Sequence, residues 1–280
     1  MLKSIGQCYS GIRTHQQLLD ITAHNVANVN TVAFKEKQVS FQELTYREIA
    51  QRRLPRAGNP LVPPQSGRGS AVSSSIPLME QGSLTFTGKS LDMAIVGEGF
   101  FRVVRPDGSY AYTRGGNFSL DVEGNLTLPG GIRLEPGLYL QEREDEVDLL
   151  TLTISPDGTI FAYPLAAGEE EEYFLPEEEG LPAGAVKLGE ISLYRFINTE
   201  SLSHIGENLL FPSEASGPPV AGTPGDNGFG RLEQGYLESS NVDLAQQVTA
   251  LIRGQRALQS SSRTMTTADE LWALTLNIQS

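Results

Sequence analysis

The chain has 280 residues, a length that suits one large domain or two smaller ones. Its formal net charge is −13, which argues against a nucleic-acid binder, because such proteins present a basic face. With one cysteine, Cys8, and three scattered histidines, neither a disulfide framework nor a cysteine-based zinc site is expected. The sequence contains no transmembrane stretch of about 20 apolar residues, and its N-terminus lacks the apolar core of a cleaved signal peptide.

Residues 3–28 are expected to form a helix with apolar residues at heptad spacing. One row repeats every seven positions: Ile5, Ile12, Leu19 and Val26. A companion row lies three positions earlier: Leu2, Tyr9, Gln16 and Ala23. This 3-4 alternation is typical of a coiled-coil seam. Because the seam is narrow, we expect the helix to need a partner for stability in water.

Residues 242–278 contain no proline and repeat the same pattern over about 37 residues, on the order of 55 Å of helix. The main row is Leu244, Leu251, Leu258, Met265 and Trp272, with Val248 and Leu276 four positions beyond members of it. The expected companion positions are Gln255, Ser262 and Asp269. Ser240 or Asn241 is predicted as the N-cap, and Asp243 is favourably placed for the helix dipole.

Two interpretations of these end helices remain open. Each helix alone also fits an ordinary amphipathic helix packed on a globular core. Polar residues inside both seams, and their position at opposite ends of the chain, favour a paired or assembled coiled coil. Asn25, Asn28 and Asn30 cluster at the end of the first helix, where they either bond between subunits in a packed helical core or cap and turn the chain. The predicted assembly interface is therefore Ile5, Ile12, Leu19, Val26, Asn25, Asn28, Leu244, Leu251, Leu258 and Met265.

Between the helices the pattern changes to short strands separated by turns. Residues 55–75 are rich in proline, glycine and serine and are predicted to be a linker or a weakly structured extended segment. Short apolar runs are predicted as strands at 91–96, 100–104, 110–113, 118–120, 149–154, 159–163 and 190–196. Residues 212–230 are predicted as a second linker.

The expected fold class is therefore α+β, with terminal helices forming a coiled-coil-like core domain and an inserted, mainly antiparallel β domain. The predicted domains are 1–75, an N-terminal helix and linker; 76–211, the β-rich domain; and 212–280, a linker and C-terminal helix. The first and third segments are expected to form one assembly domain together.

The sequence offers little that suggests chemistry. Acidic residues gather at 142–148, 169–172 and 177–179, which are interpreted as solvated loops, because they lack the alternating ligands and central glycine of a calcium loop. Gly97-Glu98-Gly99 lacks the lysine and hydroxyl of a phosphate-binding loop and is interpreted as a tight turn. No nucleophile elbow occurs, and a flexible acidic run does not place two carboxylates across a cleft. We expect no catalytic residues, no cofactor, no metal site and no small-molecule substrate.

Four groups of residues carry a resemblance to a known family. The first is the run from Ala23 to Lys35, AHNVANVNTVAFK. The second and third are the central runs Leu91–Phe101, LDMAIVGEGFF, and Tyr112–Phe118, YTRGGNF. The last consists of Gly235–Val242, GYLESSNV, with Gln255-Arg256-Ala257 beyond it. In this order along the whole chain, these motifs resemble those of the flagellar rod and hook axial proteins.

The resemblance implies a non-enzymatic subunit of the bacterial flagellar basal body that polymerises into a hollow shaft transmitting torque from motor to hook. It further implies export across the cytoplasmic membrane through the flagellar type III apparatus without a cleaved signal. Its implied partners are copies of itself, other rod and hook proteins, the export apparatus and bushing rings, but no nucleic acid. Alternatives are a proximal rod paralogue or short hook protein, a secreted β-domain cell-wall hydrolase, or a coiled-coil adhesin.

Overall fold

The computed structural model describes residues 2–44, 47–48, 65–67, 69–136, 152–163, 185–226 and 228–278. The chain forms two compact units. Unit 1 consists of residues 1–28, 36–78 and 242–280, and unit 2 consists of residues 29–35 and 79–241. By this division residues 212–241, which the sequence analysis joins to the C-terminal helix, belong to unit 2. The three predicted domain boundaries stay a prediction.

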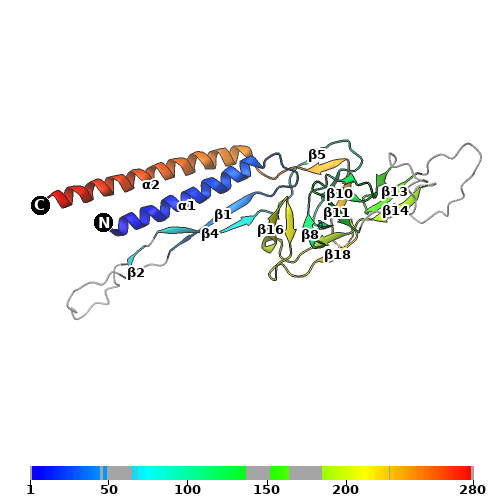
Figure 1. Cartoon of the computed structure of the whole chain (residues 1–280), viewed down its shortest axis with the longest axis horizontal. Coiled ribbons are helices and arrows are strands. Elements are labelled where there is room, and N and C mark those ends of the chain that lie inside the picture. Colours follow the sequence, from blue (N-terminus) through cyan, green and yellow to red (C-terminus); the bar gives the residue numbers. More distant parts are fainter. Residues whose placement is uncertain are drawn as a thin grey trace, which may run out of the picture. The chain divides into compact units, whose positions relative to one another are not determined.

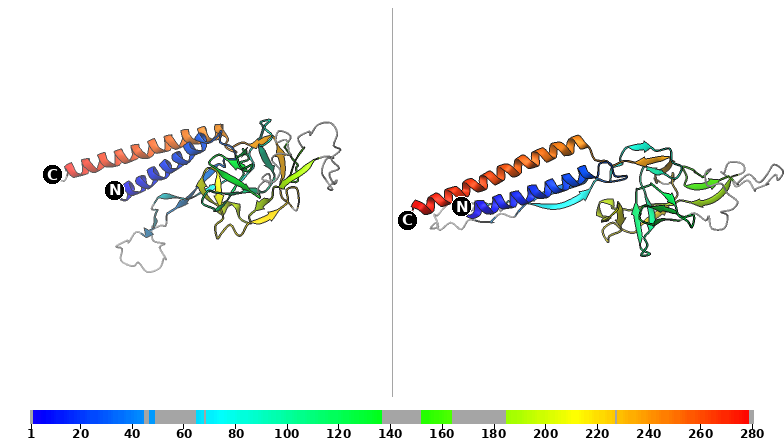
Figure 2. Two further views of the ribbon diagram at one scale, coloured as in Figure 1. Left: turned by 45° about the vertical axis from the view of Figure 1, so that its right-hand side comes forward. Right: turned by 45° about the horizontal axis from the view of Figure 1, so that its top comes forward.

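Unit 1 contains both helices. The chain forms α1 (Leu2–Ala27) and α2 (Leu244–Ile278), close to the predicted spans. The two helices lie side by side and run antiparallel, so that the N- and C-termini lie at the same end of the pair (Figures 1 and 2). Neither helix, over its described residues, has a stretch long and apolar enough to span a membrane.

The N-cap of α2 differs from the prediction. The Asp243 carboxylate accepts hydrogen bonds from the backbone N–H groups of Ala245 (2.9 Å) and Gln246 (3.3 Å). Asp243 therefore caps the helix, rather than Ser240 or Asn241, because its side chain reaches the first unpaired N–H groups.

A hairpin completes the described part of unit 1. Its strands are β1 (Lys37–Glu43), β2 (Arg47–Glu48), β3 (Gln65–Ser66) and β4 (Ser70–Pro77). Strand β1 pairs with β4 antiparallel, with a register shift between Ser40 and Phe41, and β2 pairs with β3. The linker predicted at 55–75 is thus wrong for residues 70–75, which belong to a strand. Residues 70–77 carry many serines, and backbone pairing with β1 overrides their weak strand propensity. Residues 51–64 lie outside the described residues.

Unit 2 is built from short antiparallel strands. In the first half of the chain they are β5 (Leu84–Phe86), β6 (Met93–Val96), β7 (Phe100–Val104), β8 (Tyr110–Thr113), β9 (Ser119–Leu120), β10 (Leu126–Leu128) and β11 (Ile132–Glu135). In the second half they are β12 (Thr153–Ile154), β13 (Thr159–Ala162), β14 (Val186–Glu190), β15 (Leu193–Arg195), β16 (Ser203–Gly206), β17 (Leu209–Phe211), β18 (Val220–Gly222), β19 (Arg231–Gln234) and β20 (Tyr236–Glu238). One 3-10 turn, η3 (Thr199–Ser201), follows β15.

The largest sheet of unit 2 has the strand order β16-β17-β8-β7-β11-β10-β9, with β15 pairing to both β7 and β18. Three smaller sheets complete the unit: β12-β13-β14 joins consecutive strands, whereas β19-β6 and β20-β5 join strands distant in sequence. All of these pairs are antiparallel. The fold is therefore α+β, with an antiparallel β unit inserted between the helices, as predicted.

The strands of unit 2 enclose an apolar core. Side chains alternate across β7, so that Phe101 and Val103 enter the main cluster and Phe100 enters a second one. The main cluster includes Met93, Ile95, Leu126, Ile160, Leu193 and Leu232, each at most 1% exposed. The second cluster is largely aromatic, and the rings of Tyr112 and Phe196 meet edge to face at 4.8 Å between centroids.

The strands predicted at 91–96, 100–104 and 110–113 are confirmed as β6, β7 and β8, although β6 begins at Met93. The turns predicted between them are confirmed as well. Gly97 and Gly99 have φ of 112° and 145°, values that disfavour any side chain, which explains the glycine pair as a tight turn. The second predicted linker, 212–230, is wrong at residues 220–222, which form β18. The proline and glycine content of this segment predicted a linker, although three of its residues pair with β15.

Candidate assembly surface

The helices of unit 1 contact each other through small and polar residues. A Cβ placed on Gly254 of α2 would lie 2.9 Å from Cδ2 of Leu19, and one on Gly11 of α1 would lie 3.8 Å from Oγ of Ser261. The Asn25 amide donates to Oε1 of Gln247 at 3.3 Å. These contacts fix the antiparallel register, and the glycines let the two helix backbones approach closely.

The predicted row on each helix lies mainly in this contact. Leu19 and Gly254 touch, and the other members are partly buried: Ile12, Val26, Leu251, Leu258 and Met265. Leu244 and Trp272 are the exceptions, at 49% and 38% exposed. The side chain of Ile5 lies outside the described residues. The described members of these rows are therefore partly covered within the chain, and their role in contacts between copies stays a prediction.

The predicted companion rows are exposed in the helix pair, and their role in a seam between copies stays a prediction. On α1, Tyr9, Gln16 and Ala23 point outward and are exposed. On α2 the same holds for Gln255, Ser262 and Asp269, and the inward companions are one position earlier: Gln247, Gly254, Ser261 and Ala268. Sequence reasoning missed them because a hydrophobic pattern gives no weight to glycine, serine and glutamine, whose small size or hydrogen bonds suit a close contact.

Polar groups occupy the best-buried positions of the helix pair. No apolar side chain of the described α1 and α2 is fully buried, whereas Thr14, Thr22, Asn25 and Gln247 are. Asn25 donates to the carbonyl of Lys37 and accepts from its N–H, both at 3.0 Å. The pair is therefore held by hydrogen bonds and partial apolar contact rather than by a dry core.

The asparagines at the C-terminal end of α1 form hydrogen bonds within the chain. Asn25, at 1% exposed, bonds to Lys37 and Gln247, as described. Asn28 donates to the carbonyl of His24 at 2.9 Å, at the end of the helix. The Asn28 bond fits the capping and turning role that the sequence left open, whereas Asn25 joins distant segments of the chain; bonding between subunits stays a prediction.

The outer face of α2 leaves an apolar row uncovered. Leu244, Val248 and Ile252 follow at four-residue intervals and are 49%, 42% and 48% exposed. At four-residue spacing they lie on one face of the helix. Leu271 and Leu274, at 55% and 59% exposed, add apolar surface near the C-terminal end. We call Leu244, Val248 and Ile252 the outer row.

Unit 2 contains a buried ion cluster that the sequence analysis missed. The Glu238 carboxylate, fully buried, accepts from Nζ of Lys35 (2.5 Å), Nε of Arg114 (2.7 Å) and the N–H of Gly82 (2.9 Å). Arg114 also donates to the carbonyls of Gly99, Ile95 and Gly97. Every donor and acceptor of the cluster is thus paired, which a buried charge requires.

The electrostatics of this cluster follow from its burial and its charges. Burial acts to raise the pKa of Glu238, but the charges of Arg114 and Lys35 and the hydrogen bonds outweigh it, so this pKa lies below its ordinary 4.5. Burial lowers the pKa of the Lys35 ammonium, despite the neighbouring carboxylate. Lys35, Arg114 and Glu238 each stand in a different motif of the family resemblance, a signal that pairing these motifs could have revealed.

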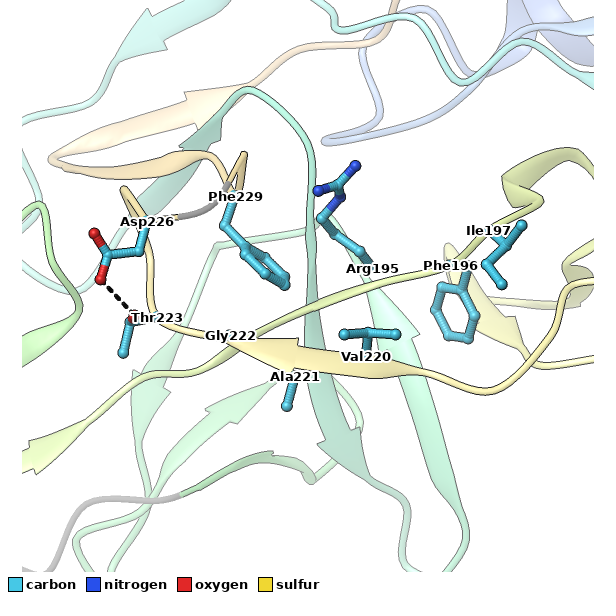
Figure 3. Close-up of a pocket in the computed structure, with 9 residues that line it drawn as sticks. All are labelled: Arg195, Phe196, Ile197, Val220, Ala221, Gly222, Thr223, Asp226 and Phe229. Carbon is cyan, nitrogen blue, oxygen red and sulfur yellow. Dashed lines mark hydrogen bonds between the residues drawn. The ribbon is translucent and has the colours of Figure 1, made fainter.

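A surface pocket of about 440 Å³ lies beside the edge strand β18 (Figure 3). The ring of Phe229 covers Gly222, and Ile197 and Val220 are 85% and 52% exposed at its rim. Its charged residues are already bonded: Asp226 accepts from the Thr223 hydroxyl at 3.1 Å, and Arg195 pairs with Glu98. The pocket is lined by apolar side chains and satisfied ion pairs, an arrangement without a free acid, base or nucleophile to carry a reaction.

Metal-binding chemistry is likewise without a candidate in the part of the chain that the structure describes. No group of three or more histidine, cysteine, aspartate or glutamate side chains is gathered there. The acidic runs at 142–148, 169–172 and 177–179 lie outside the described residues.

The chain matches two models of flagellar protein families. Residues 94–162 match the flagellar hook protein FlgE/F/G D1 domain, and residues 233–278 match the C-terminal region of the flagellar basal body rod FlgEFG proteins. The first match contains β6 to β13, and the second contains β20 and α2.

Curated relatives align with the whole chain. It is 33% identical to the flagellar basal-body rod protein FlgG of Borreliella burgdorferi, with 100% of this chain and 99% of that protein covered. It is 34% identical to FlgG of Bacillus subtilis over the full length of both. The flagellar hook-basal body complex protein FlhP of the same Bacillus is 27% identical, with 98% of each chain covered.

Proposed function

This chain belongs to the flagellar rod and hook protein family, and on that premise we propose that it is a structural subunit of the distal rod. Copies polymerise into a hollow axial shaft in the basal body that transmits torque from the motor to the hook. Within one organism, Bacillus subtilis, the chain is more similar to FlgG (34%) than to FlhP (27%), which supports the distal rod over other positions. The family is one of structural proteins rather than enzymes, and the comparisons give the hydrolase alternative no support.

One observation carries the assembly proposal. The two helices of unit 1 cover each other on one face and leave the outer row of α2 about half exposed. Burying such a row is favourable, and a stripe of four-residue spacing fits the groove of another helix. We therefore place the contact between copies on Leu244, Val248 and Ile252, and we propose that neighbouring helix pairs pack there as in a coiled coil.

The proposed export of the subunit depends on the low stability of the helices of unit 1. None of the apolar side chains that the structure describes in its helices is completely buried, so the helices fold with little stability of their own. Such segments pass a narrow export channel unfolded and become ordered when neighbouring copies cover them. We propose the flagellar type III export apparatus as the carrier, without a cleaved signal, and other rod and hook proteins and the bushing rings as further partners.

The test is polymerisation of purified protein, viewed by electron microscopy. Wild-type protein is expected to form tubes or stacks at high concentration. Val248→Asp and Ile252→Asp place a charge in the outer row, and both are expected to abolish polymers while the circular dichroism of the monomer is unchanged. Gln246→Asp, an exposed position on the same turn of α2, is the matched control and is expected to polymerise normally. Normal polymers from both outer-row variants would contradict the proposed interface.

A proximal rod paralogue or a short hook protein is the second candidate, because the first family model spans FlgE, FlgF and FlgG. Complementation separates the candidates. Expression of this chain is expected to restore motility in a strain that lacks its distal rod protein and to leave a strain lacking a proximal rod protein non-motile. The reverse result would assign the chain to the proximal rod.

A further inference from the structure

The partners of the Glu238 carboxylate come from distant parts of the chain. Lys35 is separated from Glu238 by 203 positions, Arg114 by 124 and Gly82 by 156. The carboxylate therefore receives its three hydrogen bonds only when four stretches of sequence have come together.

These stretches also lie where the chain enters and leaves unit 2. Unit 2 consists of the segments 29–35 and 79–241. Lys35 is the last residue of the first segment, and Gly82 and Glu238 lie three residues from the two ends of the second. Within the unit they are tied together by Lys35, which donates to the carbonyl of Glu80 at 2.6 Å, and by the amide of Asn241, which donates to the same carbonyl at 3.2 Å. The N–H of Ala33 donates to the carbonyl of Glu238 at 2.8 Å.

The end of unit 2 completes strands that come much earlier in the chain. Strand β19 pairs with β6 and places Leu232, at 1% exposed, in the core beside Met93 and Ile95. Strand β20 pairs with β5. Backbone contact is close here as well, since a Cβ on Gly82 would lie 2.0 Å from the carbonyl oxygen of Ser239. Strands β5 and β6 thus lack their partner strands until residues 231–241 are in place, and Arg114, which follows β8, lacks its counter-ion.

We propose that the Glu238 cluster is a folding checkpoint: unit 2 reaches its native packing only when residues 231–241 dock onto the segments that carry Lys35, Gly82 and Arg114. Before that step, burial of Lys35 and Arg114 would leave two cations without a carboxylate, which is strongly unfavourable. A chain made from its N-terminus therefore keeps unit 2 unfolded until residues 231–241 have been made.

The purpose of such a checkpoint rests on the proposed function, because only an exported rod subunit gains from staying unfolded. The order of folding events that the checkpoint predicts is independent of the proposed function. The checkpoint is tested on dilute monomer, where no rod forms, so its failure and the failure of the rod assignment are separate results.

The direct test is pulse-labelling hydrogen exchange during refolding of the full chain, read by mass spectrometry. Amides of β6, β7 and β8 are expected to gain protection in the same kinetic phase as those of β19 and β20. Protection of β6 to β8 about tenfold or more ahead of β19 and β20 would overturn the checkpoint, because the early strands would then fold without the late segment.

A variant tests the role of the charge. Glu238→Gln keeps the shape and removes the counter-ion, and it is expected to lower the folding equilibrium constant about 100-fold, with most of the effect as slower refolding. Glu123→Gln is the matched control, since its ion pair with Arg133 at 3.2 Å is half exposed; its refolding rate is expected to be unchanged. If Glu238→Gln refolds at the wild-type rate and only unfolds faster, the cluster closes after the barrier and the checkpoint is wrong.

Discussion

Within each unit, one buried polar residue joins segments that are distant in the sequence. Asn25 joins α1 to Lys37 and Gln247 in unit 1, and Glu238 joins Lys35 to Arg114 in unit 2. In each case one side chain bonds to partners that are remote in sequence. A buried group of this kind stabilises one arrangement selectively, because every alternative leaves it without a partner.

The Glu238 charge gives the stability of unit 2 a defined pH dependence. Because the folded-state pKa of Glu238 is below 4.5, the charge contributes stability that is fully present above about pH 4.5 and is lost as pH falls through the folded value. Glu238→Gln is expected to cost about 3 kcal/mol at pH 7, from the unpaired cations left behind. Measured by urea unfolding, the difference between wild type and variant is expected to shrink as pH falls below 4.5. A difference that stays constant down to pH 3 would show that the carboxylate charge is not the source.

At the residue scale, the spacing of apolar residues predicts the main rows, which stay a prediction for assembly, and it says nothing of the hydrogen bonds within the chain. The rows of Leu19 and Leu251 follow directly from heptad periodicity, since an apolar seam leaves a repeating pattern. Asn25 was predicted as a site residue, but its partner is the backbone of Lys37, and a backbone group cannot be identified from the residue types in the sequence. Glu238 looked like any other acid in a chain with 34 of them, because burial is a tertiary property.

At the scale of elements, the helix pair depends on close approach at Gly254. The inward companions on α2 are small or polar, so the backbones meet where a wider seam of leucines would hold them apart. The coiled coil stays a prediction. On the inward side of α2, the contact between the helices is made by small residues.

Gly254→Leu is expected to destabilise unit 1, because even a Cβ at this position lies 2.9 Å from Leu19. Overpacking costs about 1–3 kcal/mol, more than the gain of about 1 kcal/mol in helix propensity. Thermal unfolding followed by far-ultraviolet circular dichroism is the measurement. Gly6→Ala on α1, where nothing lies within 4 Å, is the control and is expected to raise the melting temperature slightly. Equal stabilisation by both changes would mean that the helices are not in contact at Gly254.

Elements with strong periodicity were predicted well and short ones poorly. The helices and β6 to β8 were anticipated, since each carries a full apolar pattern. Strands such as β4 and β18 were taken for linkers, because serine is frequent in β4 and prolines and glycines surround β18. Pairing with β1 and with β15 makes them strands.

At the scale of the whole molecule, the two units differ in how they are stabilised. Unit 2 has a core of fully buried apolar side chains, whereas the helices of unit 1 have none among their described residues. Stability scales with buried apolar surface, so unit 1 is expected to unfold first.

The single tryptophan makes this order measurable. Trp272 lies on α2, whereas the buried Tyr112 and Tyr194 lie in unit 2. In urea, the fluorescence of Trp272 is expected to change at a lower concentration than the near-ultraviolet circular dichroism that reports the tyrosines. Trp272→Phe serves as the control for the origin of the fluorescence. Coincident transitions would contradict this order, since they would indicate one cooperative fold.

Charge is also divided unevenly between the units, which bears on polymerisation. The segments of unit 1 carry 11 basic and 7 acidic residues, and those of unit 2 carry 10 basic and 27 acidic ones. Copies of the chain therefore repel one another through unit 2, while the apolar outer row of α2 attracts neighbours independently of charge.

Salt is expected to promote polymerisation for this reason. Raising sodium chloride from about 0.05 M to about 0.5 M shortens the screening length severalfold and weakens repulsion between acidic surfaces, but leaves apolar contacts intact. The protein concentration at which polymers first appear, measured by sedimentation, is expected to fall. Val248→Asp is the control and is expected to stay unassembled at both salt concentrations, because screening cannot replace a lost apolar contact. A concentration threshold that rises with salt would show instead that attraction between unit 1 of one copy and unit 2 of another dominates, and it would move the main interface away from the outer row.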